Sequence, residues 1–346
     1  MSKQHKVTAP QKLLDEKGSI KEPGYSTSLI WKYKRNDIKA NKFRIKEWDY
    51  YYVGNSNHAI ALTIADNSYM ALVSLTLFDF IGKTEITKTL MQPFSMGKLN
   101  LPDTSKEGVT AFENKRVNMK FANDGKERKL TCTFKNFTKG NDLNAEITLT
   151  EEPEDTMVIA TPFAKDDKAF YYNQKINCMK ASGTVTHGET VYEFNTPDSM
   201  GTLDWGRGVW TYKNTWYWGS MSVRLPDGAP FGFNIGYGFG DTSAATENMV
   251  FYKGKAHKLD EVKFNIPTID GKDDYMSPWT FTSNDKRLEL TFEPVIDRYA
   301  YANLLVLKTI QHQVFGKFSG KVILDDGKVI ELKDAMGFAE KVFNKY

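Results

Sequence analysis

Alternation of apolar and polar residues with a period of two is the feature that most constrains the fold of this chain. Val117, Met119 and Phe121 alternate with polar residues, and the alternation resumes at Leu130 after a turn sequence, Asn123-Asp124-Gly125. Successive side chains of a β-strand point to opposite faces, so each segment presents one apolar face. An Asp-Gly step readily adopts the positive φ of a tight turn. The pattern therefore predicts an antiparallel hairpin.

The same alternation recurs along most of the chain. Examples are Ala145/Ile147/Leu149, Val185/His187, Leu288/Leu290/Phe292 and residues 322–330 around Asp325-Asp326-Gly327. Many short strands separated by turns predict an all-β fold, either a sandwich or a barrel. Only Asp334–Tyr346 is predicted to be a helix, because Phe338, Val342 and Phe343 would lie on one side of it.

The length of 346 residues predicts two domains, since single cores usually comprise about 100–200 residues. Residues 1–24 are polar, contain Pro10, Pro23 and Gly24, and show no periodicity, so they are predicted to form an N-terminal tail. We place the domain boundary near the middle of the remaining chain. The expected division is residues 25–205 for an N-terminal β-domain and 206–346 for a C-terminal β-domain.

Charge and composition exclude several classes of protein. The net charge is only +3, and basic and acidic residues are interspersed, as in Lys126-Glu127-Arg128-Lys129. A nucleic-acid-binding surface would require a basic cluster, so no nucleic-acid partner is expected. No apolar run approaches the ~20 residues of a membrane-spanning helix. Aromatic residues make up 13% of the chain, which favours strands and the walls of an apolar ligand site.

The N-terminus and the cysteines indicate an intracellular location. Met1–Lys6 is not followed by an apolar run, so no secretory signal is expected. Cys132 and Cys178 each lie within a predicted strand and have no ligand-spaced cysteine or histidine neighbour. They are predicted to be two reduced, buried thiols. A cytoplasmic location follows as the default expectation.

The chemically distinctive stretch is Leu203–Gly219. Trp205, Trp210, Trp216 and Trp218 lie within it, together with Asp204 and Arg207. On a strand, Trp216 and Trp218 share one face. Two interpretations carry similar weight. The rings are either core residues with Asp204–Arg207 as a structural salt bridge, or they line a functional site, since such large rings pack poorly into a charged, glycine-rich segment.

Several short motifs together resemble the bacterial family catalogued as domain of unknown function 2804. They are Lys175 with Ser182-Gly183-Thr184-Val185, the Leu203–Gly219 stretch, Thr246-Glu247-Asn248, Pro278-Trp279, Phe292-Glu293-Pro294, Phe315-Gly316-Lys317-Phe318-Ser319-Gly320 and Gly337-Phe338-Ala339-Glu340. The order of these features is also similar, more distantly, to the tandem lipocalin-like proteins of the hydroxyneurosporene synthase and AttH group. That group includes carotenoid hydratases and fungal cyclisation catalysts.

The resemblance implies two lipocalin-like (calycin-type) antiparallel β-barrels or sandwiches that pack together around an apolar pocket. One departure concerns the chemistry. The distant group has Asp-His where this chain has Asp204-Trp205, so a histidine proton donor is missing at that position. Hydratase chemistry does not transfer directly through this motif.

The expected site combines acids with aromatic rings. Asp204 or Glu247 would donate a proton, Arg207 would hold a substrate oxygen, and Trp rings would stabilise cationic character. The expected ligand-binding residues are Arg207, Trp210, Tyr212, Trp216, Trp218, Asn248 and Trp279. We expect Asp204, Arg207 and Glu247 to converge with Trp216 and Trp218 on one cavity.

The expected partner is a small, largely apolar molecule such as a terpenoid or lipid, enclosed by a hydratase, isomerase or cyclase that needs no cofactor. Two alternatives remain open: a non-catalytic carrier that uses the same pocket, and a carbohydrate-binding module with surface Trp and Tyr. Tryptophans inside the protein would favour the first two over the third. The chain has no zinc-ligand spacing and no nucleophile motif, so no metal site is expected. The sequence carries no signal for an oligomeric state.

Three further features bear on the fold or the site. His312 on its predicted strand faces either the pocket or water, and Glu340 is expected to cap the packing of the predicted C-terminal helix. In Phe231–Gly240, aromatic and aliphatic residues occupy one face of a strand and glycines and Asn234 the other. Such a glycine face allows close approach of a backbone or ligand, or a bend at a barrel corner.

Overall fold

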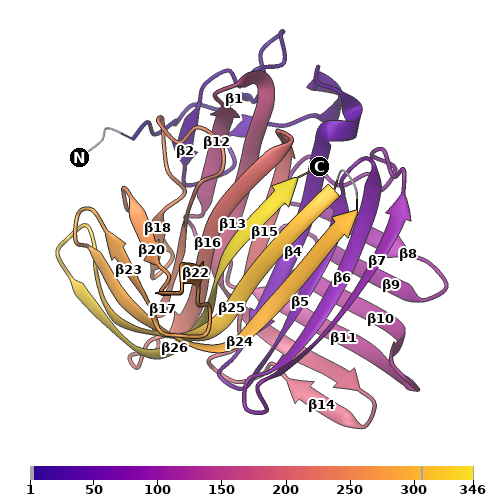
Figure 1. The fold of residues 1–346 in the computed structure, drawn as a ribbon, viewed down its shortest axis with the longest axis vertical. Helices are drawn as coiled ribbons and strands as arrows, with labels where there is room; N and C mark the ends of the chain where they lie inside the picture. Colours follow the sequence, from indigo (N-terminus) through magenta and orange to yellow (C-terminus); the bar gives the residue numbers. More distant parts are fainter. Residues whose placement is uncertain (1–3, 305–306, 346) are drawn as a thin grey trace.

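The computed structural model describes residues 4–304 and 307–345, although of Leu304 only the backbone. Two large antiparallel sheets dominate this part of the chain (Figure 1). The first sheet has 13 strands within the described residues. They are β2 (Gly24–Ser26), β4 (Ile45–Gly54), β5 (His58–Asp66), β6 (Met70–Asp79), β7 (Thr84–Pro93), β8 (Gly108–Glu113), β9 (Val117–Asn123), β10 (Arg128–Thr138), β11 (Asn141–Thr150), β12 (Met157–Phe163), β13 (Asp166–His187), β14 (Thr190–Glu193) and β15 (Met200–Val209).

The second sheet is built from the C-terminal part of the chain and has nine strands among the described residues. They are β16 (Lys213–Arg224), β17 (Pro230–Tyr237), β18 (Met249–Tyr252), β19 (Lys255–Lys258), β20 (Val262–Asn265), β23 (Trp279–Ser283), β24 (Leu288–Leu304), β25 (Leu307–Ile323) and β26 (Val329–Lys345). Four short strands form two small sheets, β1 (Gln11–Lys12) with β3 (Trp31–Lys32) and β21 (Thr268–Ile269) with β22 (Lys272–Asp273), and two 3-10 turns span η1 (Arg35–Asp37) and η2 (Lys42–Arg44).

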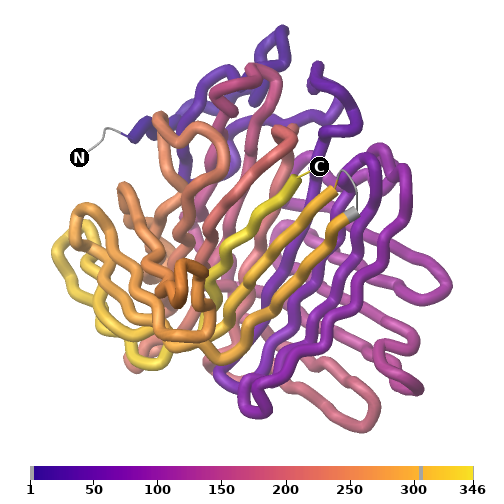
Figure 2. Tube along the Cα trace, in the orientation of Figure 1, coloured from indigo at the N-terminus to yellow at the C-terminus, as the bar shows by residue number. Residues whose placement is uncertain are grey.

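The two sheets repeat one strand order. The first runs β7-β6-β5-β4-β15-β13-β11-β10-β9-β8, and the second runs β19-β18-β17-β16-β26-β25-β24-β23-β20. In each, the chain begins near the centre, moves strand by strand to one edge, crosses over, and returns to the centre from the other edge. The tube in Figure 2 shows each half curling around its own interior. The structure is thus two curled half-barrels in tandem, which confirms the predicted all-β, lipocalin-like class.

A short sequence repeat accompanies this structural repeat. Lys180-Ala-Ser-Gly-Thr-Val185 lies in β13 and Lys317-Phe-Ser-Gly-Lys-Val322 in β25. Gly183 opposes Ile147 and Gly320 opposes Leu290 in the neighbouring strand. Both glycines have φ near +130° (127° and 133°), and an added Cβ would lie 2.1 Å from the Glu146 carbonyl oxygen or 2.3 Å from that of Glu289. The same backbone irregularity is therefore built at the same place in both halves.

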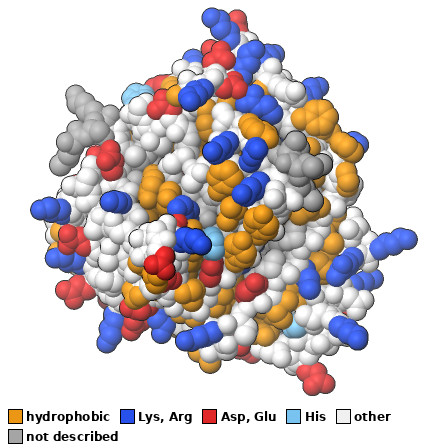
Figure 3. Space-filling model, viewed as in Figure 1, with side chains coloured by type: hydrophobic (Ala, Val, Ile, Leu, Met, Phe, Trp, Pro, Cys, Tyr) orange, Lys and Arg blue, Asp and Glu red, His pale blue; other side chains and the backbone are white. Residues whose placement is uncertain are grey.

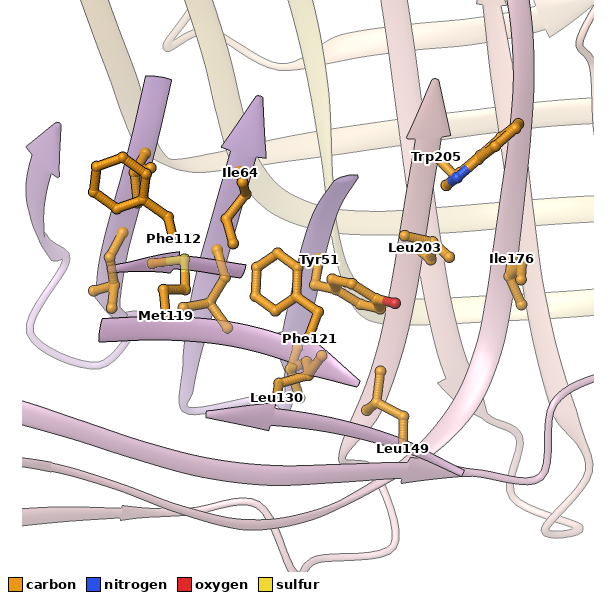
Figure 4. Close-up of a cluster of buried hydrophobic side chains, with 14 of the residues drawn as sticks. Tyr51, Ile64, Phe112, Met119, Phe121, Leu130, Leu149, Ile176, Leu203 and Trp205 are labelled. Atoms are coloured by element: carbon orange, nitrogen blue, oxygen red, sulfur yellow. The ribbon is translucent and has the colours of Figure 1, made fainter. Parts of the chain in front are cut away.

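Each half-barrel has a dense apolar interior. The interior of the first is formed mainly by residues from β4 to β15, including Phe121, Ile176, Leu203 and Trp205, which Figure 4 shows among the strands of this half. The interior of the second is rich in phenylalanine and includes Trp279, which is fully buried. Side chains of the protein occupy most of both interiors, and a hollow of only about 20 Å³ borders Tyr51, Leu203 and Trp205 of the first.

The two half-barrels pack against each other through the opposite faces of their central strands. On β15, Leu203, Trp205 and Val209 belong to the first interior, whereas Thr202 bonds Ser222 of β16 at 3.1 Å. We call this contact zone the seam. It lies between β4, β13 and β15 on one side and β16, β17 and β24–β26 on the other, and two apolar clusters fill much of it. The strands at its centre are consequently buried on both faces.

The predicted C-terminal helix is wrong, because residues 329–345 form strand β26. The period-two pattern was hidden by two charged residues at the centre of the strand. Phe338 and Val342 face the seam with Glu340 between them, while Ala339 faces the second interior beside Lys341. Because Glu340 and Lys341 are charged, the apolar residues that remain visible are Phe338 and Val342. Their i, i+4 spacing is also the spacing of one face of a helix.

Other expectations from the sequence agree with the structure. β9 and β10 pair as the predicted hairpin, with Gly125 at φ +87° in its turn. Cys132 and Cys178 are buried and unbridged, and burial raises the pKa of each thiol to about 12. Within the predicted N-terminal tail, whose assignment stays a prediction, Val7 and Leu13 are buried against the body. The chain passes between the sheets at Val209–Lys213, and the division into folding units at 205 and 206 stays a prediction.

No helix among the described residues is long and apolar enough to cross a membrane. On the face shown in Figure 3, basic and acidic side chains are dispersed, and hydrophobic side chains gather near the middle.

The paired glycines give a prediction about stability. Gly183→Ala and Gly320→Ala should each lower the free energy of unfolding by ~1–3 kcal/mol, because a Cβ at this φ meets a carbonyl oxygen. Gly140→Ala is the control for positive φ alone, since Gly140 has φ +82° but nothing lies within 4 Å of its added Cβ, so its loss should be smaller. Urea unfolding measures all three. Equal effects at Gly183, Gly320 and Gly140 would contradict the assignment.

Candidate functional site

Three groups of the first sheet form a row that faces the seam. Asp204 of β15 lies opposite Tyr50 of β4 on one side and opposite Lys175 of β13 on the other. Lys175 Nζ is 2.7 Å from Asp204 Oδ2, and both residues are buried. Asn173 of β13 donates from Nδ2 to Asp204 Oδ1 at 2.7 Å. Asp204 is therefore a carboxylate held on both oxygens by donors from the adjacent strand.

A second row crosses the facing sheet. Trp218 of β16 is opposite Glu340 of β26, Glu340 is opposite Gln313 of β25, and Gln313 is opposite Arg298 of β24. Arg298 donates to Gln313 Oε1 at 2.7 Å. These side chains share one face because each is directly across from the next, and cross-strand partners point the same way.

The two rows meet across the seam. Lys175 Nζ lies 3.8 Å from the centre of the Trp218 ring, so the ammonium contacts both the Asp204 carboxylate and an indole face. Tyr50 packs edge-on against Trp218, with ring centres 5.9 Å apart. Segments that are distant in the sequence thus supply one cluster of charges and rings.

Two further carboxyl groups complete the cluster. Trp216 Nε1 donates to Glu340 Oε1 at 2.9 Å. Trp218 Nε1 donates to Asn234 Oδ1 at 2.7 Å, and Asn234 Nδ2 donates to Glu247 Oε2 at 3.2 Å. Glu247 lies in the connection before β18, and its Oε1 would be 2.8 Å from a Cβ added to Gly236. One glycine of the Phe231–Gly240 strand therefore makes room for the acid.

Burial shifts the protonation of these acids. Burial raises the pKa of Glu340 to about 7, although the Trp216 N–H and the charges of Lys175 and Arg298 oppose the shift. Burial also raises the pKa of Glu247, against the charge of Lys175 and the amide of Asn234. The charge of Asp204 raises both pKa values further. The seam thus combines a carboxylate paired with lysine and two carboxyl groups whose pKa values burial raises.

The predicted site residues divide between several places. Asp204, Glu247, Trp216 and Trp218 lie together in the seam. Trp210 joins them through its ring, which is 5.6 Å from Trp216 and 4.8 Å from Phe239. Tyr212 lies in the connection between β15 and β16, and it is 51% exposed.

Asn248 and Trp279 have structural contacts instead. Asn248 Oδ1 accepts from the Gly236 N–H at 2.7 Å, and its Nδ2 donates to the Asp260 carbonyl at 2.8 Å. Trp279 belongs to the second interior, where Phe281 and Phe292 pack on it.

Arg207 does not lie in the seam, and the expected Asp204–Arg207 salt bridge is wrong. The two residues are three apart on one strand, so they point to opposite faces. Arg207 lies in the first interior, pairs with Asp49 at 3.0 Å, donates to the carbonyl groups of Trp48, Gly206 and Pro102, and stacks on Trp205 at 4.2 Å.

Sequence reasoning missed the roles of Lys175, Asn173, Tyr50 and Arg298 in this cluster, and it assigned Glu340 to a helix cap. A usable signal exists. In β13, Asn173, Lys175 and Asn177 recur with period two in a strand that is otherwise largely buried, and each occupies the seam face. Polar residues repeating on one face of a doubly buried strand indicate a polar interface rather than solvent.

A groove of about 260 Å³ opens at another part of the seam. It is lined by side chains that include Tyr52, Asp198, Arg224, Leu225, Ala335 and Met336. Phe338 lies between this groove and the charged cluster, since its ring is 5.5 Å from Tyr52 and 4.8 Å from Trp218. This groove is thus adjacent to the charged cluster but separated from it by aromatic rings. Within residues 4–304 and 307–345, no group of three or more His, Cys, Asp or Glu residues is placed to hold a metal ion.

Comparison with known proteins identifies one family and several solved structures that align with this chain. The model of a family described as "Domain of unknown function (DUF2804)" matches residues 4–346. No curated protein matches the chain in sequence. A candidate AttH from Nitrosomonas europaea has a similar fold, with a TM-score of 0.53 and 10% identity over 89% of this chain and 95% of that one.

Two further solved structures align over nearly the whole chain. They are kievitone hydratase from Nectria haematococca, with a TM-score of 0.46, 10% identity and coverage of 98% of both chains, and CghA, with a TM-score of 0.47, 10% identity and coverage of 97% of both chains.

The buried ion pair predicts a strong coupling. Asp204→Asn and Lys175→Met should each destabilise the protein by about 3–5 kcal/mol, because each leaves one buried charge unpaired. The double variant should lose less than the sum of the two. The exposed pair Glu289–Lys321, with 3.8 Å between its charged atoms, provides the control, and Glu289→Gln should cost less than ~1 kcal/mol. Additive losses in denaturant unfolding would refute the coupling.

Glu340 predicts a pH dependence. Its carboxyl binds a proton more tightly in the folded than in the unfolded chain, so its contribution to stability is complete below pH ~4.5 and is lost as the pH rises to about 7. Glu340→Gln keeps the acceptor for Trp216 and removes the titration. The variant should gain roughly 2–3 kcal/mol relative to wild type between pH 5 and pH 8. The measurement is chemical denaturation at both pH values, and a constant difference would contradict the shift.

Proposed function

The chain belongs to the DUF2804 family, and we propose that it binds a small, largely apolar molecule in the seam and transfers protons to and from it without a cofactor. The reaction class is hydration, isomerisation or cyclisation of an unsaturated terpenoid or lipid-like substrate. The observation that carries the proposal is the cluster of three buried carboxyl groups around the Trp218 ring, two of them with raised pKa values.

The acids have different roles in this proposal. Glu340, with a pKa of about 7, is protonated in a large fraction of molecules at neutral pH and is the proton donor. Glu247 is a second donor, connected to Trp218 through Asn234. Asp204 remains charged beside Lys175 and stabilises positive charge that develops on the substrate. Protonating a carbon–carbon double bond creates such a charge.

The tryptophans are the complementary part of the site. An indole face attracts cations, and Trp218 already holds the Lys175 ammonium at 3.8 Å. Trp210 and Trp216 are only partly buried and form the wall where the seam approaches solvent, with the exposed Tyr212 at its rim. Asn248 supports β17 through the N–H of Gly236, and Trp279 packs within the second interior, so neither has a part in the proton transfer. Arg207 supports the first interior and has no part in the proton transfer.

The alternatives differ in what they require of the seam. A carrier would use the same apolar walls but would gain nothing from acids whose protonated forms are favoured by burial. A carbohydrate-binding module needs exposed aromatic faces, whereas Trp205 and Trp218 are 1% and 6% exposed. The fold shared with the candidate AttH is compatible with each of these functions, since folds do not determine activity.

Proton transfer is tested with deuterium. We expect the protein, incubated in D₂O with a panel of unsaturated terpenoids and fatty acids, to introduce deuterium at carbon in at least one compound. Mass spectrometry detects the label whether the product is an alcohol, an isomer or a ring. Glu340→Gln should reduce the rate by at least ~100-fold, the usual contribution of a positioned acid.

The exposed Glu289→Gln is the matched control and should retain the wild-type rate. Compounds that bind without acquiring deuterium would support the carrier. Equal rates for Glu340→Gln and wild type would overturn the assignment of the donor.

A further inference from the structure

Asn173 has a buried acceptor that the protein leaves unused. Its Nδ2 donates to Asp204 Oδ1 at 2.7 Å, and the residue is 0% exposed. Because the ionised Asp204 accepts hydrogen bonds only, this contact fixes which end of the amide points toward it. Asn173 Oδ1 is the other end, and among the described residues it has no hydrogen-bond partner.

Tyr50 places a second such group on the other side of Asp204. Its hydroxyl is buried and makes no hydrogen bond within the described part of the chain. Burial raises its pKa, as do the charges of Glu340 and Asp204, while that of Arg298 lowers it. The amide of Gln313 lies beside the hydroxyl and lowers this pKa as well. Both unpartnered groups therefore border the charged cluster.

Unpartnered buried polar groups are rare, because each loses its hydrogen bonds to water on folding. Asn173 and Tyr50 are also the neighbours of Asp204, one on each flanking strand. A structural requirement for Asp204 explains the Asn173 Nδ2 contact but not the free oxygen. The free acceptor is explained if another molecule supplies its donor.

We propose that Asn173 Oδ1 binds the O–H of water or of a substrate hydroxyl, with the Tyr50 hydroxyl as the second oxygen-binding group, and that the reaction of the seam adds or removes water. This inference rests on the proposed function. An amide oxygen accepts and cannot donate, so a hydrocarbon, an ether or a ketone leaves Asn173 unsatisfied. Water and alcohols satisfy it.

The reaction balances with the groups present. Glu340 gives its proton to one carbon of a double bond, and the neighbouring carbon becomes cationic. The water held by Asn173 forms a C–O bond to that carbon and releases a proton to the Asp204 carboxylate. Exchange with solvent restores the proton on Glu340 and removes it from Asp204. The sum is alkene plus water to alcohol, and the reverse sequence dehydrates an alcohol.

The first test is the position of the oxygen atom. A crystal structure of the wild-type protein, at a resolution that orders water molecules, should show a water or ligand hydroxyl within ~2.6–3.2 Å of Asn173 Oδ1. Tyr52→Phe, on the same face of β4, should leave this oxygen in place. A dry Asn173 Oδ1, or one that accepts from a protein donor, would overturn the inference whether or not the protein is an enzyme.

The second test separates water addition from proton transfer. In H₂¹⁸O, the alcohol formed from the compound that incorporates deuterium should contain ¹⁸O. Asn173→Leu should lower this incorporation at least tenfold more than it lowers deuterium incorporation, because Glu340 remains. A labelled product without ¹⁸O overturns the inference and leaves the proposed function intact. An ordered oxygen without any turnover does the opposite, since it contradicts the proposed reaction and retains the oxygen site.

Discussion

The ion pair of Lys175 and Asp204 lies where two sheets press against each other and water has little access. The middle of β13 and all of β15 are buried on both faces, one toward the first interior and one toward the seam, so each buried charge there must be matched within the protein. Arg207 is matched by Asp49 in the interior, and Asp204 by Lys175 in the seam. The rest of the site is arranged around this second pair, because Trp218, Asn173 and Tyr50 all take their places relative to it.

The seam is a consequence of duplication. Each half builds the same strand order and the same Ser-Gly irregularity, and each fills its own interior with large side chains. Lipocalin-like folds usually enclose a ligand inside the barrel, but here the acids gather between the halves. Burial between two apolar surfaces raises the pKa values of Glu247 and Glu340 above those of the same groups in water. Burying these polar groups lowers the stability of the fold, and the surrounding packing offsets that loss. Such a cost is typical of groups retained for chemistry.

Much of the fold follows from the sequence, because alternation and Asx-Gly turns are local signals. The cluster of Asp204, Trp216 and Trp218 was also visible, since Trp216 and Trp218 share a strand face. The partners were not, because register between strands distant in the chain decides that Lys175 meets Asp204 and that Glu340 meets Trp218. The helix predicted for 334–346 was wrong for the same reason. Glu340 looks like a solvent-exposed charge in the sequence, and only its contacts with distant strands make it a buried strand residue. Arg207 was misplaced because adjacent charges were assumed to pair, whereas strand alternation separates them.

The central claim is that the ligand lies in the seam and not inside either half-barrel. The most direct measurement is the crystal structure of the protein with the ligand it retains when purified from its own host. The account predicts a ligand in contact with Trp218, with one of its atoms within hydrogen-bond distance, ~2.6–3.2 Å, of a carboxyl oxygen of Glu340 or Asp204. A ligand enclosed by the first interior against Trp205 and Arg207, with the seam closed, would contradict it.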